Sequence, residues 1–253
     1  MLKRMPKILT RVLKQTACRL FFFLIGASVV SAGSIGVSPV RLTLSNSQQM
    51  GEITVRNDGT EPIIIQMEIM NWSQLQGKNV FTPTRELLGN PPIFTIPVGG
   101  SQLVRFGLRR ASDINRELTY RIFLQELPQS NNNALMGTKM LMRVSMPVFV
   151  LPEVDAKPVL LWQAARTLKG ALKISVSNNG NAHVQIAHFK LSLPGNAQPL
   201  VTQNSADYIL PGQSYSWILT ADADYPIPRS GESLQLFAQT DSGNIETEVM
   251  IEP

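Results

Sequence analysis

The chain after residue 33 consists of short apolar runs separated by turn-forming residues. Residues 171–177 (ALKISVS) alternate between apolar and polar, which places successive side chains on opposite faces of a strand. Glycine, proline, asparagine and aspartate interrupt such runs about every 8–12 residues, a spacing typical of sandwiches and barrels. No apolar pattern with the 3.6-residue period of a helix extends over a helical length. The pattern therefore predicts an all-β protein.

The region before Pro152 predicts about seven strands, the number that an immunoglobulin-like sandwich contains. The expected strands are 35–45, 52–56, 63–70, 93–96, 102–108, 119–127 and 139–150. Pro39 in the first strand suits an edge or a bulge better than a central position. Residues 57–59 (Asn-Asp-Gly) are a turn signal, and 139–150 is the longest expected strand. We therefore predict one immunoglobulin-like domain over 33–152.

A second β-rich region follows a polar segment that contains prolines. Residues 151–158 (LPEVDAKP) hold two prolines and three charged residues, which favours a linker, predicted at 153–158. A smaller β-sandwich domain is expected at 159–253. Its strands are predicted at 171–177, 183–193, 214–220, 232–240 and 245–251, with turns at 178–181 and 241–244. The fold class is thus two β-sandwich domains in tandem.

The first 32 residues have the pattern of a cleavable secretory signal. Six cations and no acid accompany an apolar core at 20–27 (LFFFLIGA), and residues 30–32 (Val-Ser-Ala) fit signal-peptidase cleavage. The apolar stretch is shorter than the ~20 residues of a membrane-spanning helix. Cleavage is therefore favoured over an anchor, and no stable membrane insertion is expected after it. Translation from Met5 instead of Met1 is an open alternative.

Removal of this leader changes the charge of the protein. The chain has 23 Lys and Arg residues against 18 Asp and Glu residues, a net charge of +5. Without the six leader cations, 17 remain against 18, a net charge of −1. Proteins that bind nucleic acid need a basic surface on their folded part, so nucleic acid is not an expected partner. The single cysteine, Cys18, also lies in the leader, so the mature domains are predicted to fold without a disulfide.

The sequence contains no motif that points to an enzyme. We find no glycine-rich phosphate loop, no G-x-S-x-G and no H-E-x-x-H, and the scattered acids nominate no catalytic pair. His183 and His188 are five residues apart, which places them on opposite faces of a strand and argues against a metal site. We therefore predict a protein without enzymatic activity, bound metal or cofactor.

Methionine is concentrated near the last predicted strand of the first domain. Met136, Met140, Met142 and Met146 have even spacing, which places them on one face of an extended chain. Three interpretations remain open: core packing, Cu(I) binding by the thioethers, and an adaptable apolar strip that contacts partners. Cu(I) binding is the least favoured of the three.

Several segments resemble the periplasmic pilus-assembly chaperones of chaperone–usher systems, the PapD-like superfamily. The segments 38–42 (SPVRL), 55–59 (VRNDG), 100–105 (GSQLVR) and 120–128 (YRIFLQELP) resemble the first, second, fifth and sixth strands of that family. A long seventh strand ends in PVFVLP at 147–152. Pro147 and the absence of cysteine after the leader make the chain more similar to the archaic or alternative branch than to the P-pilus type.

The resemblance implies two immunoglobulin-like domains with a cleft between them, and it implies donor-strand complementation. In that mechanism, the seventh strand of the first domain is lent to a pilus subunit whose sandwich lacks its last strand. The donor residues expected from the resemblance are Met136, Met140, Met142 and Val144.

The resemblance also implies two kinds of charged contact. The family clamps the C-terminal carboxylate of a subunit with two basic residues in the cleft. Arg41 matches the first of them, and Arg143 or Lys139 is expected to be the second. Glu126 and Asp241 are expected to take part in a contact between the domains.

The function implied is a periplasmic chaperone that binds pilus subunits and delivers them to an outer-membrane usher. Pilus subunits and the usher are therefore the expected partners. A structural β-sandwich pilus component or a surface adhesin module is the alternative, and a periplasmic metal-handling or hydrolytic enzyme is a third.

Overall fold

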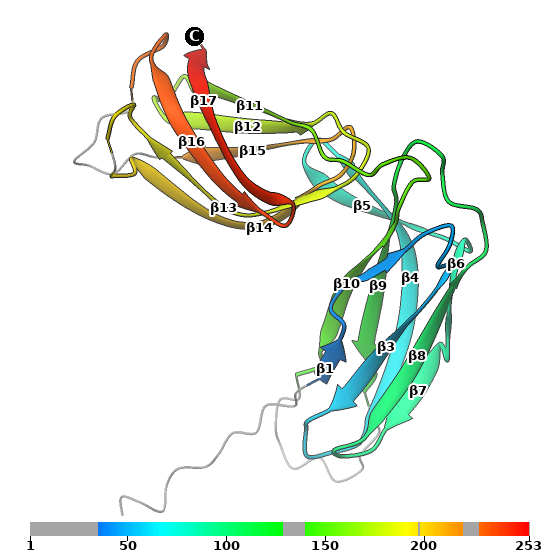
Figure 1. Ribbon diagram of the computed structural model, residues 1–253. Helices are drawn as coiled ribbons and strands as arrows, with labels where there is room; N and C mark the ends of the chain where they lie inside the picture. The colour runs from blue at the N-terminus through cyan, green and yellow to red at the C-terminus, as the bar shows by residue number, and fades with distance from the viewer. Residues whose placement is uncertain (1–34, 129–139, 197, 220–227, 253) are drawn as a thin grey trace, which may run out of the picture.

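The computed structural model describes residues 35–128, 140–196, 198–219 and 228–252 and confirms the all-β prediction. Every regular element in these ranges is a β-strand. No helix among them has the length and apolar character required to cross a membrane. The strands form two groups, β1–β10 and β11–β17, which meet at an angle in Figure 1. The predicted leader at 1–32 lies outside the described residues.

Domain one is a sandwich of two sheets. Its strands are β1 (Ile35–Ser38), β2 (Leu42–Leu44), β3 (Met50–Asn57), β4 (Ile63–Leu75), β5 (Lys78–Pro83), β6 (Leu87–Asn90), β7 (Ile93–Ile96), β8 (Ser101–Leu108), β9 (Leu118–Glu126) and β10 (Arg143–Val150). One sheet has the order β1-β3-β8-β6, and the other has the order β2-β10-β9-β4-β5 with β7 paired to β4.

The first predicted strand is divided between the two sheets. On one side of Pro39, β1 pairs antiparallel with β3. On the other side, β2 pairs parallel with the last three residues of β10. Because proline cannot donate a hydrogen bond to a ladder, the chain changes sheets at this residue.

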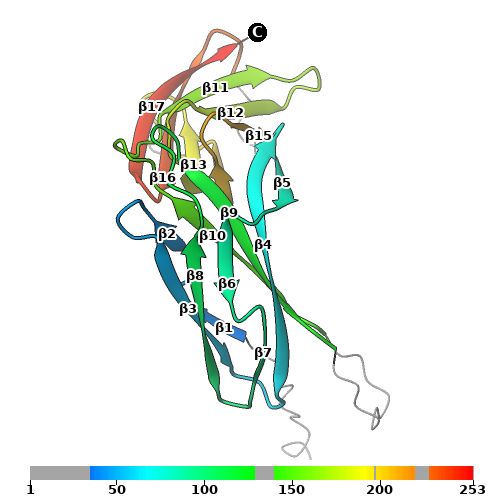
Figure 2. The ribbon, with the colours of Figure 1, turned by 90° about the vertical axis from the view of Figure 1, so that its right-hand side faces the viewer.

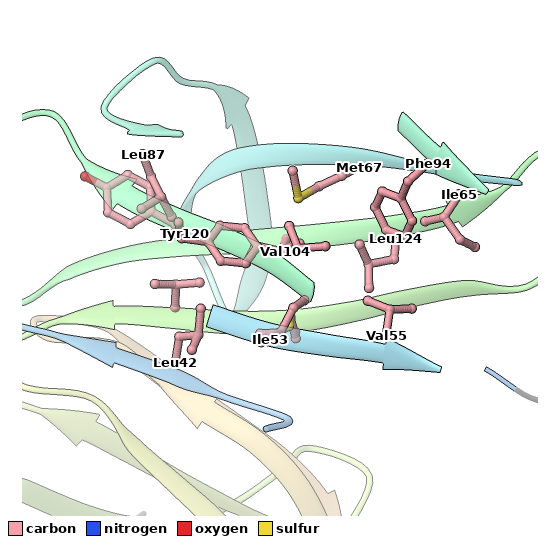
Figure 3. Packing of buried hydrophobic residues seen from close by; sticks show 14 of the residues in the cluster. Leu42, Ile53, Val55, Ile65, Met67, Leu87, Phe94, Val104, Tyr120 and Leu124 are labelled. Atoms are coloured by element: carbon pink, nitrogen blue, oxygen red, sulfur yellow. The ribbon is translucent and has the colours of Figure 1, made fainter. Parts of the chain in front are cut away.

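The core of domain one lies between its two sheets (Figure 3). Alternate side chains of β3, β8 and β9 point into it, including Ile53, Val104 and Leu124, none of which is more than 1% exposed. Each such buried side chain stabilises the fold by about 1.5–3 kcal/mol. The alternation that predicted the strands thus also predicts which face is buried.

Domain two is a second sandwich with its own core. Its strands are β11 (Leu160–Arg166), β12 (Leu172–Asn178), β13 (Val184–Ser192), β14 (Val201–Ile209), β15 (Ser214–Leu219), β16 (Ser233–Thr240) and β17 (Gly243–Glu252), in the order β14-β13-β16-β17-β11-β12-β15. Trp162, Phe189 and Trp217 pack together inside it. Between the domains, residues 151–159 contain no strand.

The two predicted Asn-Gly-containing turns hold their strands in the same way. The Asn57 amide donates to the carbonyl oxygens of Glu61 and Ile96, and its side-chain oxygen accepts from the Gly59 amide. Asn178 repeats the arrangement with Ala182, Ile209 and Gly180. Both asparagines are fully buried. Each domain therefore has a side-chain amide that fixes the turn after one of its strands, β3 in domain one and β12 in domain two.

Two predictions about the strands were wrong. Domain one has ten strands among its described residues instead of about seven. The longest is β4, with 13 residues, whereas β10 begins only at Arg143 and not at residue 139. β9 ends at Glu126, which lies opposite Met142 and is hydrogen-bonded to it, so residues before Met142 have no partner in β9.

Candidate functional site

An apolar contact joins the two domains. Trp72 of β4 and Phe149 of β10 pack against Tyr208 and Leu210 of domain two, a group that we call the interface cluster. The Trp72 ring centroid lies 6.0 Å from that of Phe149 and 5.5 Å from that of Tyr208. Trp72, Phe149 and Leu210 are buried, so this cluster is the water-free part of the domain boundary.

Gln74 adds two hydrogen bonds across the boundary. Its Nε2 donates to the Tyr208 carbonyl oxygen at 2.7 Å, and its Oε1 accepts from the Leu210 amide at 3.0 Å. Gln74 belongs to β4, and the β4–β5 hairpin extends toward β15 of domain two, as Figure 2 shows. At the tip, Gly77 has a φ of +75° and lies against Tyr215. The unusual length of β4 therefore serves the contact between domains.

Charged groups form a third part of the boundary, the interdomain polar cluster of Arg41, Glu117, His183 and Asp241. His183 Nδ1 lies 2.9 Å from both Glu117 carboxylate oxygens, and His183 Nε2 lies 3.6 Å from Asp241 Oδ2. Arg41 Nη1 donates to Asp241 Oδ2 at 2.7 Å. The Gln185 amide donates to the other Asp241 oxygen. Each of the two acids therefore contacts a group of the opposite domain.

These contacts shift two pKa values. Burial would raise the pKa of Asp241, but hydrogen bonds from His183, the Gln185 amide and Arg41 outweigh it and lower the pKa to about 2. Burial would lower the pKa of His183, but hydrogen bonds and charges of Asp241 and Glu117 outweigh that effect and raise the pKa. Both shifts favour the charged forms of these groups in the folded state.

A polar cavity of about 290 Å³ opens beside the interface cluster. We call it the cleft pocket; its walls include Trp72, Asn79 and Arg121 of domain one and Tyr208 and Tyr215 of domain two. Lys78 and Asp207 also line it. The pocket therefore depends on the placement of both domains.

Arg121 is the notable cation of the cleft pocket. Its Cζ lies 3.9 Å from the Trp72 ring centroid and 5.4 Å from that of Tyr208. Its Nε is buried and has no hydrogen-bond partner in the described part of the chain, and no ion pair to Arg121 occurs there. Burial lowers the pKa of Arg121, although a guanidinium remains charged. A planar cation held on an aromatic face and without an acid suits a carboxylate ligand.

Besides the cleft pocket, a second candidate binding feature is the open edge of β10. β9 pairs with all eight residues of β10, but on the other side β2 pairs only with Val148–Val150. The backbone of 143–147 therefore faces no strand on that side among the described residues. Such an edge can accept another strand. Met140, Leu141 and Met142, just before β10, are exposed apolar residues.

Residues 34–154 match the model of the pili and flagellar-assembly chaperones, PapD N-terminal domain. Residues 34–154 therefore form a domain of this chaperone family. No curated protein sequence matches it at a significant level. Membership thus rests on domain one, which carries the open strand edge and half of the cleft.

Solved chaperone structures share the fold over both domains. A chain of the CsuC–CsuE chaperone–tip adhesion subunit complex, from archaic Csu pili of Acinetobacter baumannii, is 17% identical with a TM-score of 0.64 and covers 87% of this chain and 100% of its own. The E. coli chaperone DraB is 17% identical, with a TM-score of 0.57 and coverages of 86% and 97%. A chain of the Salmonella enterica SafA pilin–SafB chaperone complex is 16% identical with a TM-score of 0.57, and the match covers 85% of this chain and 93% of that one. At these identities the likeness establishes the shared two-domain fold.

The predicted anchor residues of this chaperone lie in different places. Arg41 lies at the domain boundary, where it pairs with Asp241. Arg143 lies at the start of β10 with Cζ 4.4 Å from the Phe123 ring centroid and Nη2 3.7 Å from Glu68. It is four residues along the ladder from Pro147, the partner of Arg121, which corresponds to about 13 Å. Lys139 lies outside the described residues.

The predicted donor residues are partly described. Met140 is 87% exposed and Met142 is 36% exposed. Val144, in β10, is half-buried against the core of domain one. Met136 lies outside the described residues. Met146 is buried in the core, so the packing interpretation is correct for this methionine and not for Met140.

The two predicted interdomain acids are separated. Asp241 lies in the interdomain polar cluster. Glu126 is buried at the opposite end of β9 from Glu117, and its carboxylate accepts a hydrogen bond from the Met142 amide of the same domain. At the domain boundary the acid of this strand is Glu117, just before β9.

Sequence reasoning missed Glu117, His183, Gln74 and Arg121. A lone arginine inside the apolar strand TYRIFLQEL was the available signal for Arg121. His183 was interpreted as an ordinary strand residue, whereas it lies just before β13 and stacks on Phe149 with ring centroids 3.4 Å apart. Groups of three or more potential metal-binding His, Cys, Asp or Glu residues do not occur in the described part of the chain.

Proposed function

We propose that this chaperone works in the periplasm, where it binds pilus subunits by donor-strand complementation and passes them to an outer-membrane usher. The open edge of β10 beside Met140–Met142 is the observation that carries the proposal. An incomplete sandwich exposes an apolar groove and an unpaired strand edge, which promote aggregation. A lent strand satisfies that backbone, and its alternate side chains fill the groove.

The face of the lent strand follows from the register. In β10, Val144 and Met146 point toward the core of domain one. Extension of the strand toward the N-terminus would place Met142 and Met140 on the same face, because side chains alternate with a period of two. These two side chains would then continue the row beyond the sandwich and enter the groove of the subunit. Unbranched methionine adapts to different groove shapes.

We further propose that the cleft pocket receives the C-terminal carboxylate of the subunit, with Arg121 as its cation. The unpartnered Nε of Arg121 supports this assignment. Arg41 and Arg143 remain proposals for additional anchors. Each of them already has an acid near it, Asp241 and Glu68 respectively, so either would have to share or exchange that partner.

Co-expression with a pilus subunit encoded beside the chaperone tests the proposal. A 1:1 complex is expected for the unchanged protein. Arg121→Ala should reduce recovery of the subunit at least tenfold, whereas Arg105→Ala, on the exposed face of β8, should not change it. Equal recovery with Arg121→Ala and Arg105→Ala would reject the anchor assignment.

A separate pair of variants tests strand donation. Met142→Glu should abolish the complex, because it places a charge in the apolar groove. Met50→Glu, at a position of domain one that is 65% exposed, is the matched control and should retain the complex. A subunit that stays soluble and protease-resistant without the chaperone would refute the chaperone role itself.

Fractionation distinguishes this proposal from the alternative of a structural pilus component or adhesin. The chaperone should be found in the soluble periplasmic fraction, and an immobilised usher should retain it only together with a subunit. Recovery in isolated pili would favour the alternative.

A further inference from the structure

His183 occupies the centre of the domain boundary. It lies just before β13 in domain two, yet its ring stacks on Phe149 of β10 with an interplanar angle of 5°. Its ring centroid also lies 5.8 Å from that of Tyr208, a wall of the cleft pocket. The side chain is only 12% exposed. A change at this imidazole therefore affects both β10, the strand that has the open edge, and Tyr208 in the wall of the cleft pocket.

Two carboxylates face the two nitrogens of this ring. The Glu117 carboxylate has no exposed surface, and among the described residues its side-chain contacts are to His183, through Nδ1 and the backbone amide. Asp241 faces Nε2 at 3.6 Å and is shared with Arg41. The remaining neighbours, Phe149 and Tyr208, are aromatic rings.

The protonation state of the His183 ring decides whether each of the two carboxylates faces an N–H donor. A protonated imidazole has N–H donors on both nitrogens, one for each carboxylate. A neutral imidazole has one donor and one lone pair. If Nδ1 keeps its proton for Glu117, the lone pair of Nε2 faces the Asp241 carboxylate. If Nε2 keeps it, the lone pair faces Glu117, which is buried and has no other side-chain cation near it among the described residues.

We propose that His183 is a positioning residue for the cleft, and that its protonation controls how tightly domain two is held against β9 and β10. The protonated ring joins Glu117 of domain one to Asp241 of domain two and supports Phe149 and Tyr208. Loss of the proton leaves a carboxylate facing a lone pair, so the domains separate more readily and the cleft pocket loses its fixed width. The inference concerns the domains themselves and does not depend on what binds in the cleft.

The sign of the pH dependence follows from the direction of the shift. The pKa of His183 is raised in the folded protein. Its contribution to the domain contact is therefore complete below the ordinary histidine pKa of about 6.5 and is lost as the pH rises through the raised value. The domain boundary should be tighter in mildly acidic solution than in alkaline solution.

The chain has two histidines, which makes the titration unambiguous. In His188→Gln, the single remaining imidazole signal in a proton NMR titration belongs to His183. Its pKa should lie above about 6.5. Spin labels at Ser101→Cys in domain one and Gln235→Cys in domain two, both exposed positions, report the interdomain distance in a Cys18→Ser background.

The distance distribution of His188→Gln should be narrow near pH 5.5 and broader near pH 8.5, values on either side of the ordinary histidine pKa of about 6.5. His183→Gln should give the broader distribution at both values. A His183 pKa at or below about 6.5, or the same distribution at both pH values in His188→Gln, would overturn the proposal. So would a His183→Gln protein that tightens on acidification as its parent does. If His183→Gln does not fold, the titration and the distances of His188→Gln still decide the question.

Discussion

Gln74→Ala should uncouple the two domains while leaving each of them folded. The side chain is 9% exposed and lies outside both domain cores. Its side chain donates one hydrogen bond to the Tyr208 carbonyl and accepts one from the Leu210 amide, and among the described residues its one other such contact is with Asn79. The substitution therefore removes two contacts that bridge the domains and one within the β4–β5 hairpin.

The magnitude follows from the burial of the partners. Leu210 is 3% exposed, so water does not readily replace the lost acceptor of its amide. A hydrogen bond contributes about 0.5–1.5 kcal/mol net, and a buried group left without a partner costs about 1–3 kcal/mol. We expect the free energy of domain docking to fall by about 2–4 kcal/mol. Because about 1.4 kcal/mol is a factor of ten, docking should weaken by about 30-fold to about 1000-fold.

Calorimetry and denaturant unfolding measure this effect. The unchanged protein should unfold in one cooperative transition, whereas Gln74→Ala should show two. Its tryptophans report on different regions: Trp72 lies at the boundary, and Trp162 and Trp217 lie in the core of domain two. In Gln74→Ala, the fluorescence change of Trp72 should precede that of the other two.

Gln163→Ala, at an exposed position of β11, is the matched control and should behave as the unchanged protein. Gln74→Glu keeps the acceptor for the Leu210 amide but loses the donor to Tyr208, so its effect on docking should be of similar size to that of Gln74→Ala. A single transition in Gln74→Ala with the midpoint of Gln163→Ala would refute the reasoning, since the hairpin would then contribute nothing to docking.

Three further predictions concern other polar groups. Tyr120→Phe removes the hydrogen bond from the fully buried ring to Glu86, 2.8 Å long, and should lower the free energy of urea unfolding by about 1 kcal/mol; an unchanged midpoint would contradict it. Asn57→Ala removes the donor to the carbonyl oxygens of Glu61 and Ile96 and should destabilise domain one by about 2–4 kcal/mol in the same urea unfolding experiment. A destabilisation of less than about 1 kcal/mol would contradict this expectation. Asp241 has a pKa lowered from 3.8 to about 2, so its contribution should be complete above pH about 3.8 and lost toward pH about 2. Asp241→Asn should flatten stability over that interval, and an unaltered acid profile would disprove this.

Local features of the fold could be predicted from the sequence, because each depends on neighbouring residues. The alternation in 171–177 predicted the strand β12, and the Asn-Gly turn signals predicted the turns of Asn57 and Asn178. Strand ends were less predictable. The start of β10 at Arg143 lies opposite Gln125, near the end of β9, and no residue near 139–142 indicates it.

The domain boundary could not be predicted for a physical reason of another kind. Gln74 and Tyr208 are 134 residues apart, and Glu117 and His183 are 66 residues apart. Their contacts arise only after both sandwiches have folded and docked. The resemblance to the chaperone family predicted Asp241 in a contact between the domains, but spacing alone offered no reason to join it to a histidine. In the same way, a lone arginine in an apolar strand can be a solvated surface residue. Arg121 differs because its buried Nε has no hydrogen-bond partner among the described residues.

The late start of β10 sets an entropic threshold for its partners. Residues 140–142 are not part of a strand, and Pro147 has no amide hydrogen to donate to a neighbouring strand. Met142 is already held by hydrogen bonds with Glu126. A bound strand that used Met140 would have to fix residues 140 and 141 in an extended form, at about 1–2 kcal/mol each, or about 2–4 kcal/mol in all. A partner with a long, complementary groove gains enough from apolar contact to offset this ordering. A short or polar strand edge does not gain enough contact to offset this ordering. The protein therefore disfavours non-specific strand pairing, even before any particular side-chain contact is considered.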